Sequence, residues 1–594
     1  MRAPAALLLL TIAATALAQP QPLPTHRPAP TPYTPPPLTE LLPPATTDLS
    51  SLLRHYTADE TTLRRFHSLT VSPATFAAQE QFYSAWRRTL DQIPFEPLSL
   101  HGRAEYLTLR LLLDQRLHAT AQRRARIAEI ASLLPFAPAI IELREARERV
   151  DPLDPRDAAT RVTQANKQAR EMVQWLSKPK PERPKSTPSE ALRAAAATAE
   201  LQGALKDWYT FYNDYDPLFT WWLAEPYKTF DATLTRYRDL LRENLAGLAK
   251  DDTETIIGDP VGRDALTSAL RAEMIPYSPE QILAIGQREF AWCEAEMKKA
   301  SRELGFGDDW KRAVELVKTR HVPPGEQPTL ILGLGLEAID FVSSRNLLTL
   351  PANLRDHWRI GMMSPERQRV NPFFTGGSLI SVSYPTAAMT HEQKLMSMRG
   401  NNIPFARATV FHEVIPGHNL QFFMMDRYRS WRGAFWTPFW MEGWALYWEF
   451  LLWDLNFPRN AEDKVGALFW RMHRAARIVF SLSFHLGKMT AQQCVDYLVN
   501  EVGHERDNAA AEVRRSFESG DAPLYQAAYM LGGLQFRALH RDLVQSGKLS
   551  NREFHDTILR LNVLPVDMIR ATLTNAALPK DYTPNWKFYG DINP

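Results

Sequence analysis

Four residues in the second half of the chain have the side chains of a hydrolytic metal site. His412, Glu413 and His418 lie in the segment His-Glu-Val-Ile-Pro-Gly-His, and Glu442 follows on the next expected helix. Two imidazoles and a carboxylate are a common ligand set of catalytic zinc, and they leave a fourth position open for water. A carboxylate beside the first histidine can activate that water. We therefore predict one bound Zn2+, with His412, His418 and Glu442 as metal ligands and Glu413 as the catalytic base.

The spacing of the two histidines requires a break in the helix that carries them. Side chains share one face of a helix at positions i and i+4, but His418 comes six positions after His412. On a regular helix the two would point about 240° apart. Pro416 removes a helical hydrogen bond, and Gly417 tolerates unusual backbone angles. We expect a bulge or short break at this pair to return His418 to the face of His412.

The third ligand lies at the start of a strongly apolar helix expected over residues 438–455. A buried acid in such surroundings needs a partner, and a zinc ion supplies one. Glu449 comes seven residues after Glu442 on the same helix face, where it can orient a ligand histidine. The alternative is that these are ordinary helix residues with Glu442 in a surface ion pair; the apolar surroundings favour the metal. His391-Glu392 has no second histidine at a useful spacing and is interpreted as exposed polar residues.

Helices must supply most of the site, with one short strand nearby. Residues 379–384 alternate like a strand, after a turn at Gly376-Gly377. We expect an extended peptide to pair with this strand. Apolar residues at three-and-four spacing predict helices, over 105–122, 191–208, 230–248, 405–428, 438–455, 461–484 and 524–545.

The composition is that of a soluble globular protein. Apolar residues make up 45% of the 594-residue chain and charged residues 23%, and the formal net charge is +2. This balance gives no reason to expect nucleic acid or an anionic membrane as a partner. The two cysteines, Cys293 and Cys494, are far apart in sequence, which leaves open whether they pair. The sequence does not predict an oligomeric state.

The N-terminus has the features of a secretory signal peptide over residues 1–18. Arg2 precedes a short apolar run, and Ala16-Leu17-Ala18 offers small residues for cleavage. A membrane anchor is the alternative, but the apolar run is too short to span a bilayer comfortably. We expect an exported protein, periplasmic or secreted, without stable membrane insertion after cleavage.

Three further regions follow along the chain. Residues 19–45 are rich in proline, which predicts an extended tether with little packed structure. Residues 46–350 are expected to form a mostly helical N-terminal region. Residues 351–594 are expected to form a C-terminal helical region that carries the zinc motif.

The order of the motifs resembles a bacterial family. His-Glu-x-x-Pro-Gly-His followed by Glu-Gly-Trp-Ala-x-Tyr-x-Glu is similar to the pattern of domain-of-unknown-function family 885, which looks related to the zincin metallopeptidases. The resemblance covers most of the chain and is specific over residues 412–449. It implies a mainly α fold, a large bowl-like body of the zincin metallopeptidase type. It also implies a deep central cleft, a small β-sheet beside the active-site helix, and one zinc ion on the cleft wall.

A second block of the chain is similar to the family's Pro-x-x-Gln-x-x-Tyr-x-x-Gly, over residues 523–532. Gln526 and Tyr529 share one helix face there. The resemblance implies that the Tyr529 hydroxyl donates to an oxyanion that develops during catalysis. The alternative is that Tyr529 is a packed aromatic residue.

A third block resembles an arginine-rich helix of the family that ends in Gly-x-His. Arg477 is interpreted in two ways, as binding a substrate carboxylate or as neutralising nearby glutamates. His485 ends the block and, like Gln526, is a candidate for supporting a ligand or binding substrate, although Ser481 and Ser483 stand where the family pattern has Asp and Gly.

These parts predict a zinc-dependent hydrolase, most directly a metallopeptidase that cleaves amide bonds of peptides. Glu413 would accept a proton from water and pass it to the leaving amine. One alternative is a zinc amidase that acts on a small or modified amide, such as a cell-wall fragment or a metabolite. A binding protein that keeps the fold without turnover is another, although the intact Glu413 argues against it.

Overall fold

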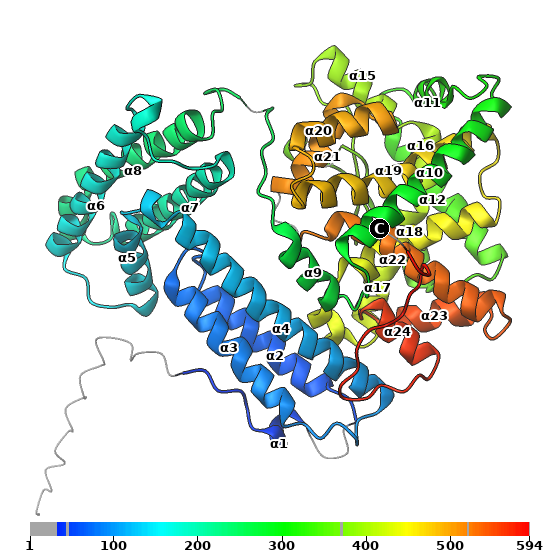
Figure 1. Cartoon of the computed structure of the whole chain (residues 1–594), viewed down its shortest axis with the longest axis horizontal. Coiled ribbons are helices and arrows are strands. Elements are labelled where there is room, and N and C mark those ends of the chain that lie inside the picture. Colours follow the sequence, from blue (N-terminus) through cyan, green and yellow to red (C-terminus); the bar gives the residue numbers. More distant parts are fainter. Residues whose placement is uncertain (1–31, 43–46, 253, 369–371, 519–521, 593–594) are drawn as a thin grey trace, which may run out of the picture.

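The computed structural model describes residues 32–42, 47–252, 254–368, 372–518 and 522–592. The protein is mainly helical, as the sequence predicts, and its helices form an arm and a larger body (Figure 1). The predicted signal peptide lies outside the described residues. Within the described part of the chain, no helix is both long and apolar enough to cross a bilayer.

The arm contains the first eight α-helices. Its outer part, from α5 onward, has a hydrophobic core of its own that includes Phe136, Trp208 and Phe230. A segment after residue 245 then connects the arm to the body (Figure 1). The helices of the arm are α1 (Leu38–Leu41), α2 (Ser50–Phe66), α3 (Pro73–Asp91), α4 (Leu100–Glu129), η1 (Ala131–Leu133), α5 (Ala137–Arg149), α6 (Pro155–Leu176), η2 (Lys180–Glu182), α7 (Pro188–Tyr212), α8 (Pro217–Leu240) and the π-helical η3 (Leu241–Leu245).

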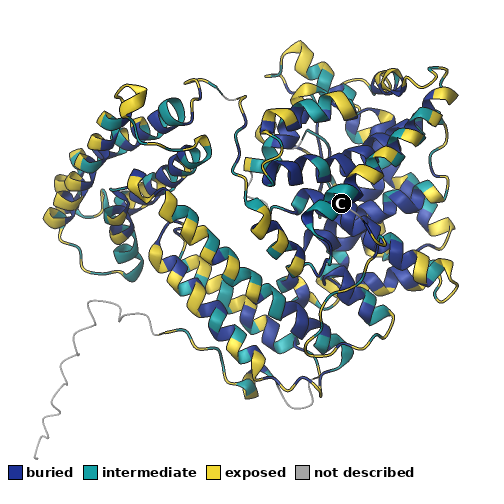
Figure 2. Ribbon diagram, viewed as in Figure 1, coloured by how far each residue is buried: buried dark blue, intermediate teal, exposed yellow. Residues whose placement is uncertain are grey.

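The body contains the other helices and a small sheet, and Figure 2 shows that its interior is largely buried. Its elements up to the second strand are α9 (Gly262–Ala272), α10 (Pro279–Glu303), α11 (Trp310–Lys318), α12 (Gln327–Ser344), α13 (Ala352–His357), β1 (Ile360–Met362), α14 (Pro365–Gln368) and β2 (Ile380–Val382). The later elements are α15 (His391–Gly400), α16 (Ile403–Glu413), α17 (His418–Arg427), η4 (Ser430–Phe435), α18 (Pro438–Asp454), α19 (Ala461–His485), α20 (Ala491–Tyr497), η5 (Leu498–Val502), α21 (Arg506–Glu518), α22 (Tyr525–His540), η6 (Arg541–Gln545), α23 (Asn551–Leu561) and α24 (Val566–Leu573).

Many of these helices begin with a local sequence signal. A side-chain oxygen at the N-cap accepts a backbone N–H of the first turn, and a proline follows at the first helical position, where its missing N–H costs nothing. The N-cap residues of this kind are Ser72, Asp154, Thr187, Asp216, Ser278 and Thr437.

The predicted boundary at residue 350 does not separate two packed units. Helix α10 packs along α19, and α12 packs against α16, which carries His412. Both α10 and α12 precede residue 350, yet they belong to the body. The amphipathic pattern of a helix shows that one face is buried, but it does not show which partner covers that face.

The predicted tether is also partly packed. Leu41 of α1 is fully buried, and the Tyr33 hydroxyl donates a hydrogen bond to Asp59 of α2 at 2.5 Å. The Tyr33 ring also lies 4.7 Å from the ring of Phe82. An aromatic and an apolar side chain thus anchor residues 32–42 despite the surrounding prolines. The other residues of the predicted tether up to residue 31 and over 43–46 lie outside the described part.

A buried ion pair joins the inner arm to the body. Glu105 of α4 and Arg432 of η4 are both fully buried, with Nε of Arg432 2.8 Å from Oε1 of Glu105. The indole of Trp431 donates to the same carboxylate oxygen at 3.0 Å. The second oxygen accepts the backbone N–H of Leu49 at 2.8 Å. These donors satisfy a charge that would otherwise be costly to bury.

The two cysteines do not form a disulfide. Cys293 lies on α10 and Cys494 on α20, and both are free and buried in one apolar cluster. Burial raises the pKa of each thiol to about 12. Both therefore act as small apolar side chains, because the reactive thiolate is disfavoured.

The sheet consists of two parallel strands beside the helices of the motif. Ile360, Gly361 and Met362 of β1 pair with Ile380, Ser381 and Val382 of β2. The predicted strand over 379–384 therefore exists, although it is shorter than expected.

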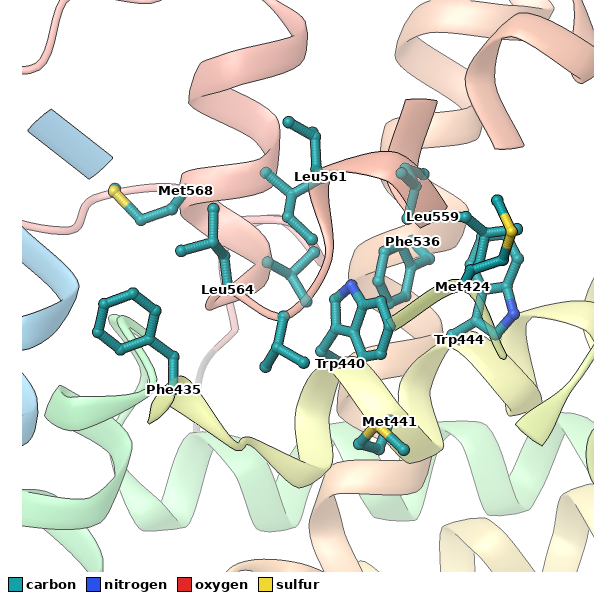
Figure 3. Close-up of a cluster of buried hydrophobic side chains, with 14 of the residues drawn as sticks. Met424, Phe435, Trp440, Met441, Trp444, Phe536, Leu559, Leu561, Leu564 and Met568 are labelled. Atoms are coloured by element: carbon teal, nitrogen blue, oxygen red, sulfur yellow. The ribbon is translucent and has the colours of Figure 1, made fainter. Parts of the chain in front are cut away.

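Helices α18 and α22 approach each other closely through two glycines. A Cβ at Gly532 would lie 2.3 Å from the carbonyl oxygen of Phe439 and 2.7 Å from Cα of Gly443. Beside this contact, the ring of Trp444 of α18 lies 6.0 Å from that of Phe536 of α22, in a core that also contains Trp440 (Figure 3). The close approach places the first turns of α22 next to Glu442.

We expect Gly532→Ala to destabilise the protein by about 1–3 kcal/mol, because the added methyl group must push two backbones apart. Gly203→Ala is the matched control. Gly203 is exposed on α7, and a Cβ there meets nothing within 4 Å, so alanine should be neutral or slightly stabilising. Urea unfolding followed by circular dichroism measures both changes. Equal stability of Gly532→Ala and the wild type would contradict the close helix contact.

Candidate metal centre

The two histidines lie on either side of a break between two helices. Helix α16 ends at Glu413 and α17 begins at His418, so the expected break at Pro416-Gly417 is present. The single helix expected over 405–428 is therefore two helices. The peptide bond between Ile415 and Pro416 is cis.

Gly417 has no room for a side chain. A Cβ there would lie 1.8 Å from the carbonyl oxygen of His412 and 2.3 Å from that of Phe411. The break is also tied to the next helix of the site, since the indole N–H of Trp444 donates to the carbonyl oxygen of Pro416 at 2.9 Å. The path of the chain between the two histidines thus depends on glycine and on a contact with α18.

Three side chains from these helices converge. Nε2 of His412 lies 3.3 Å from Oε2 of Glu442, and Nε2 of His418 lies 3.1 Å from the same oxygen. One donor atom from each of the three residues lies within 4.8 Å of the others, and all three residues are buried. Ligands of a tetrahedral zinc ion with bonds of about 2.0–2.1 Å are separated by about 3.3 Å. The donor types and the two separations from Glu442 therefore fit one zinc ion.

Each ligand side chain is held by a further polar group. Nδ1 of His412 lies 2.8 Å from Oε1 of Glu449, so Nδ1 carries the proton and Nε2 faces Glu442. Nδ1 of His418 lies 3.3 Å from the amide oxygen of Gln421. The Tyr525 hydroxyl donates to Oε1 of Glu442 at 2.6 Å. Such partners fix the orientation of the ligand groups.

The electrostatics of the cluster favour a bound cation. Burial by itself would raise the pKa of Glu442, but His418 and His412 outweigh it and lower that pKa well below its usual value. Burial would lower the pKa of His412, but its hydrogen bonds to Glu442 and Glu449 raise that pKa to about 9. The Glu442 carboxylate therefore stays charged and attracts positive charge to the space between the side chains.

Glu413 lies beside the three residues and is held by the segment before β2. One of its oxygens accepts the backbone N–H of Gly376, and the other lies 3.9 Å from Nε2 of His412. A Cβ at Gly376 would lie 2.0 Å from the carbonyl oxygen of Glu413. Only glycine allows this approach, which fixes the carboxylate that the sequence predicts to be the base.

A cavity of about 330 Å³ opens onto this cluster. His418, Glu442 and Glu413 are among the residues that line it. The other lining residues that carry hydroxyl or guanidinium groups are Arg367, Thr375, Thr409, Arg474, Arg477, Arg515, Tyr525 and Tyr529. The ring of Tyr529 stacks on that of His412 with centroids 5.8 Å apart, and its hydroxyl accepts from Arg515 at 3.1 Å.

Two predicted site residues lie elsewhere. His485 ends α19 and does not line the cavity; it contacts Phe484 and Phe517, and burial lowers its pKa to about 4. It comes eight residues after Arg477, about 12 Å further along the helix. Gln526 is buried on α22 but also lies outside the cavity lining. The sequence motifs suggested that both residues contribute to the site. Motif spacing does not show which way a helix runs relative to the cavity.

The expected pairing of a peptide with β2 is excluded at the centre of that strand. Ser381 exchanges two backbone hydrogen bonds of 2.9 Å with Thr375 on one side. On the other side, β2 pairs with β1. Both edges are therefore occupied, and a substrate has no free backbone groups to use there.

Four contributors to the site were not singled out from the sequence. Tyr525, Arg474 and Arg515 face the cavity, and Gly376 holds Glu413. Tyr525 lies four residues before Tyr529 on the same helix face, a spacing that would have pointed to it. Nothing in the local sequence of Gly376 indicates its contact with Glu413, and nothing in that of Arg515 indicates its contact with the following helix.

The sequence model of a protein family described as "Bacterial protein of unknown function (DUF885)" matches residues 64–573. This match covers the helices of the candidate site and most of the arm. No curated protein matches the chain.

Two solved structures, each described as a "putative lipoprotein", are similar to this chain. One, of unknown function, is from Shewanella oneidensis; it has a TM-score of 0.64 and 16% identity, with 88% of this chain and 99% of that chain covered. The other, from Colwellia psychrerythraea, has a TM-score of 0.56 and 15% identity, with 89% and 98% covered. At this level of identity the likeness concerns the fold alone.

We expect the wild-type chain to bind one zinc ion, and Glu449→Gln to bind it about 10- to 100-fold more weakly, because the amide holds His412 without the negative charge. Chelator competition measures the dissociation constants. His391→Ala is the matched control, since His391 is an exposed histidine at the start of α15. The assignment of the ligands would be wrong if His418→Ala bound zinc as tightly as this control.

Proposed function

We propose that this chain, which belongs to the bacterial family of unknown function DUF885, is a zinc-dependent hydrolase that cleaves amide bonds of short peptides. One observation carries the proposal. The donor atoms of His412, His418 and Glu442 converge at a cavity that also contains a fixed carboxylate, Glu413, and two tyrosine hydroxyls. This is the set of groups that amide hydrolysis requires.

Glu413 is the proposed general base and later the general acid. When bound, zinc would supply a Lewis acid and lower the pKa of water toward ~7. Glu413 would accept a proton from the attacking water and deliver it to the leaving amine. The N–H of Gly376 holds one carboxylate oxygen, which leaves the other directed toward the histidines.

The tyrosines have different proposed roles. Tyr525 donates to Glu442 and therefore positions a ligand. The Tyr529 hydroxyl accepts from Arg515, so its own proton is free to point into the cavity and donate to a developing oxyanion. The guanidinium beside it favours negative charge at this position.

The arrangement supports a zincin-type assignment for the body. Two histidines and the base come from consecutive helices, and the third ligand comes from the helix that follows. At this site the described residues line a cavity and not the deep central cleft that the resemblance implies.

The volume of the cavity also suits the second hypothesis, a small or modified amide. About 330 Å³ lies at the low end of ligand pockets. A short peptide and a small amide of similar size would both fit, whereas a folded protein substrate would have to enter as an extended end.

We further propose that the protein is exported, to the periplasm or beyond. The signal-like N-terminus supports this proposal, and so do the lipoprotein descriptions of the two similar structures.

We expect Glu413→Gln to keep zinc affinity within a few fold but to lower kcat by a factor of at least about 10², the lower end of general-base contributions. Digestion of a peptide library, with and without a chelator, measures activity and product lengths. Asp426→Asn, on α17 and outside the cavity lining, is the control. Undiminished turnover by Glu413→Gln would remove this residue from the mechanism. A wild type that binds zinc but cleaves no peptide or small amide would favour a binding protein.

A further inference from the structure

Arginines line the cavity together with two of the metal ligands. Arg474 and Arg477 come from α19 and Arg515 from α21, and a fourth arginine, Arg367, lies at the exposed part of the lining. Arg474 and Arg477 are only 4% and 3% exposed. Three guanidinium groups held so close together repel one another unless anions compensate them.

Two of these charges have buried carboxylate partners. Nε of Arg477 lies 2.6 Å from Oε1 of Glu512. Burial by itself would raise the pKa of Glu512, but Arg477 and Arg515 lower it to about 2, so this carboxylate is ionised. Arg474 lies 3.7 Å from Glu449, whose same oxygen already accepts from His412.

Arg515 has no such partner. Among the described residues, no carboxylate oxygen lies within 4.0 Å of its guanidinium nitrogens, and its hydrogen bond goes to the neutral Tyr529 hydroxyl. Glu512 and Glu442 act on Arg515 only from further away, and both carboxylates already accept hydrogen bonds from other groups. Glu442 is already bracketed by two imidazoles and the Tyr525 hydroxyl.

Buried hydrogen-bond donors of the other two arginines are also unused. Within the described part of the chain, Nη1 of Arg477 and Nε of Arg474 have no hydrogen-bond partner although both atoms are buried. A buried donor without an acceptor costs free energy. A ligand that supplies an acceptor would remove this cost and bind more tightly. Tyr529 keeps the groups together, because Arg474 and Arg477 lie over its ring at 4.8 Å and 4.2 Å.

We propose that Arg474, Arg477 and Arg515 form a subsite for a carboxylate of the substrate, so that the preferred substrates are short peptides with a negative group near the cleaved bond. This inference rests on the proposed function and specifies its substrate class. The carboxylate has two sources, the free C-terminus of a peptide or an acidic side chain. Arginine is suited to either, because its planar group can bind both oxygens of a carboxylate.

Binding of three peptides tests the proposal: Ala-Ala-Ala with a free C-terminus, its C-terminal amide, and Ala-Glu-Ala amide. Isothermal titration calorimetry is performed on zinc-loaded Glu413→Gln, in which turnover is blocked, and again on the metal-stripped chain. We expect at least one carboxylate-bearing peptide to bind about 10- to 100-fold more tightly than Ala-Ala-Ala amide, as charged hydrogen bonds predict. Tighter binding of Ala-Ala-Ala with a free C-terminus would identify the C-terminus as the ligand, and tighter binding of Ala-Glu-Ala amide would identify the acidic side chain. Equal binding of all three, or no binding of any, contradicts the subsite.

Variants of Arg515 assign the preference. In the same background, Arg515→Gln should reduce the ratio of acid to amide affinity about tenfold, and Arg515→Lys should retain part of it. Arg514→Gln is the matched control, because Arg514 is the neighbouring cation on α21 but lies outside the cavity and faces Glu518 at 3.5 Å. If Arg515 had only a structural role, Arg515→Gln would weaken binding of the acid and the amide peptides by the same factor. That result would overturn the assignment. An equal loss of the ratio in Arg514→Gln would do the same.

Failure of this inference differs from failure of the proposed function. If zinc-loaded wild type hydrolyses the acid and the amide with equal kcat/KM, the hydrolase stands and the carboxylate subsite does not. If the acid binds selectively but the wild type cleaves none of the peptides, the subsite stands and the hydrolase does not.

Discussion

The chain turns sharply between α16 and α17, and the turn leaves no room for a side chain at position 417. The carbonyl oxygens of Phe411 and His412 occupy the place of a Cβ there, and the indole of Trp444 holds the turn against α18. Without this turn, the two imidazoles would point to different sides of one helix. With it, both face one carboxylate oxygen of Glu442. The position of the base follows as well, since Glu413 is the last residue of the first helix.

The helices around the site hold a group of charged side chains whose burial costs free energy. Glu442 is buried on a helix whose Trp440, Trp444 and Trp448 are fully buried, so little water reaches it to stabilise its charge. Its hydrogen-bond partners are the two histidines and the Tyr525 hydroxyl of α22. Close contact of Gly443 with Gly532 sets the distance between α18 and α22, and therefore the reach of Tyr525 to the carboxylate. The packing of α18 against α22 thus also determines the electrostatic surroundings of Glu442.

Local sequence was sufficient for features that depend on neighbouring residues. The helical class, the break at Pro416-Gly417, the strand before the motif and the family could all be predicted, and the family is confirmed by the match over residues 64–573. Features that depend on how distant helices pack could not. The contact of Gly376 with Glu413 and that of Arg515 with Tyr529 join segments whose order in the chain says nothing of their distance in space. The same limit explains why His485 was predicted to contribute to the site, and why the sequence did not show that α10 and α12 pack against later helices. Metal binding and catalysis stay predictions.

Anomalous diffraction at the zinc absorption edge, from crystals of the zinc-loaded protein, tests the central claim most directly. We predict one strong peak about 2.0–2.1 Å from Nε2 of His412, Nε2 of His418 and a carboxylate oxygen of Glu442. A peak bound by other side chains, or no peak while these three side chains keep their positions, would contradict the account.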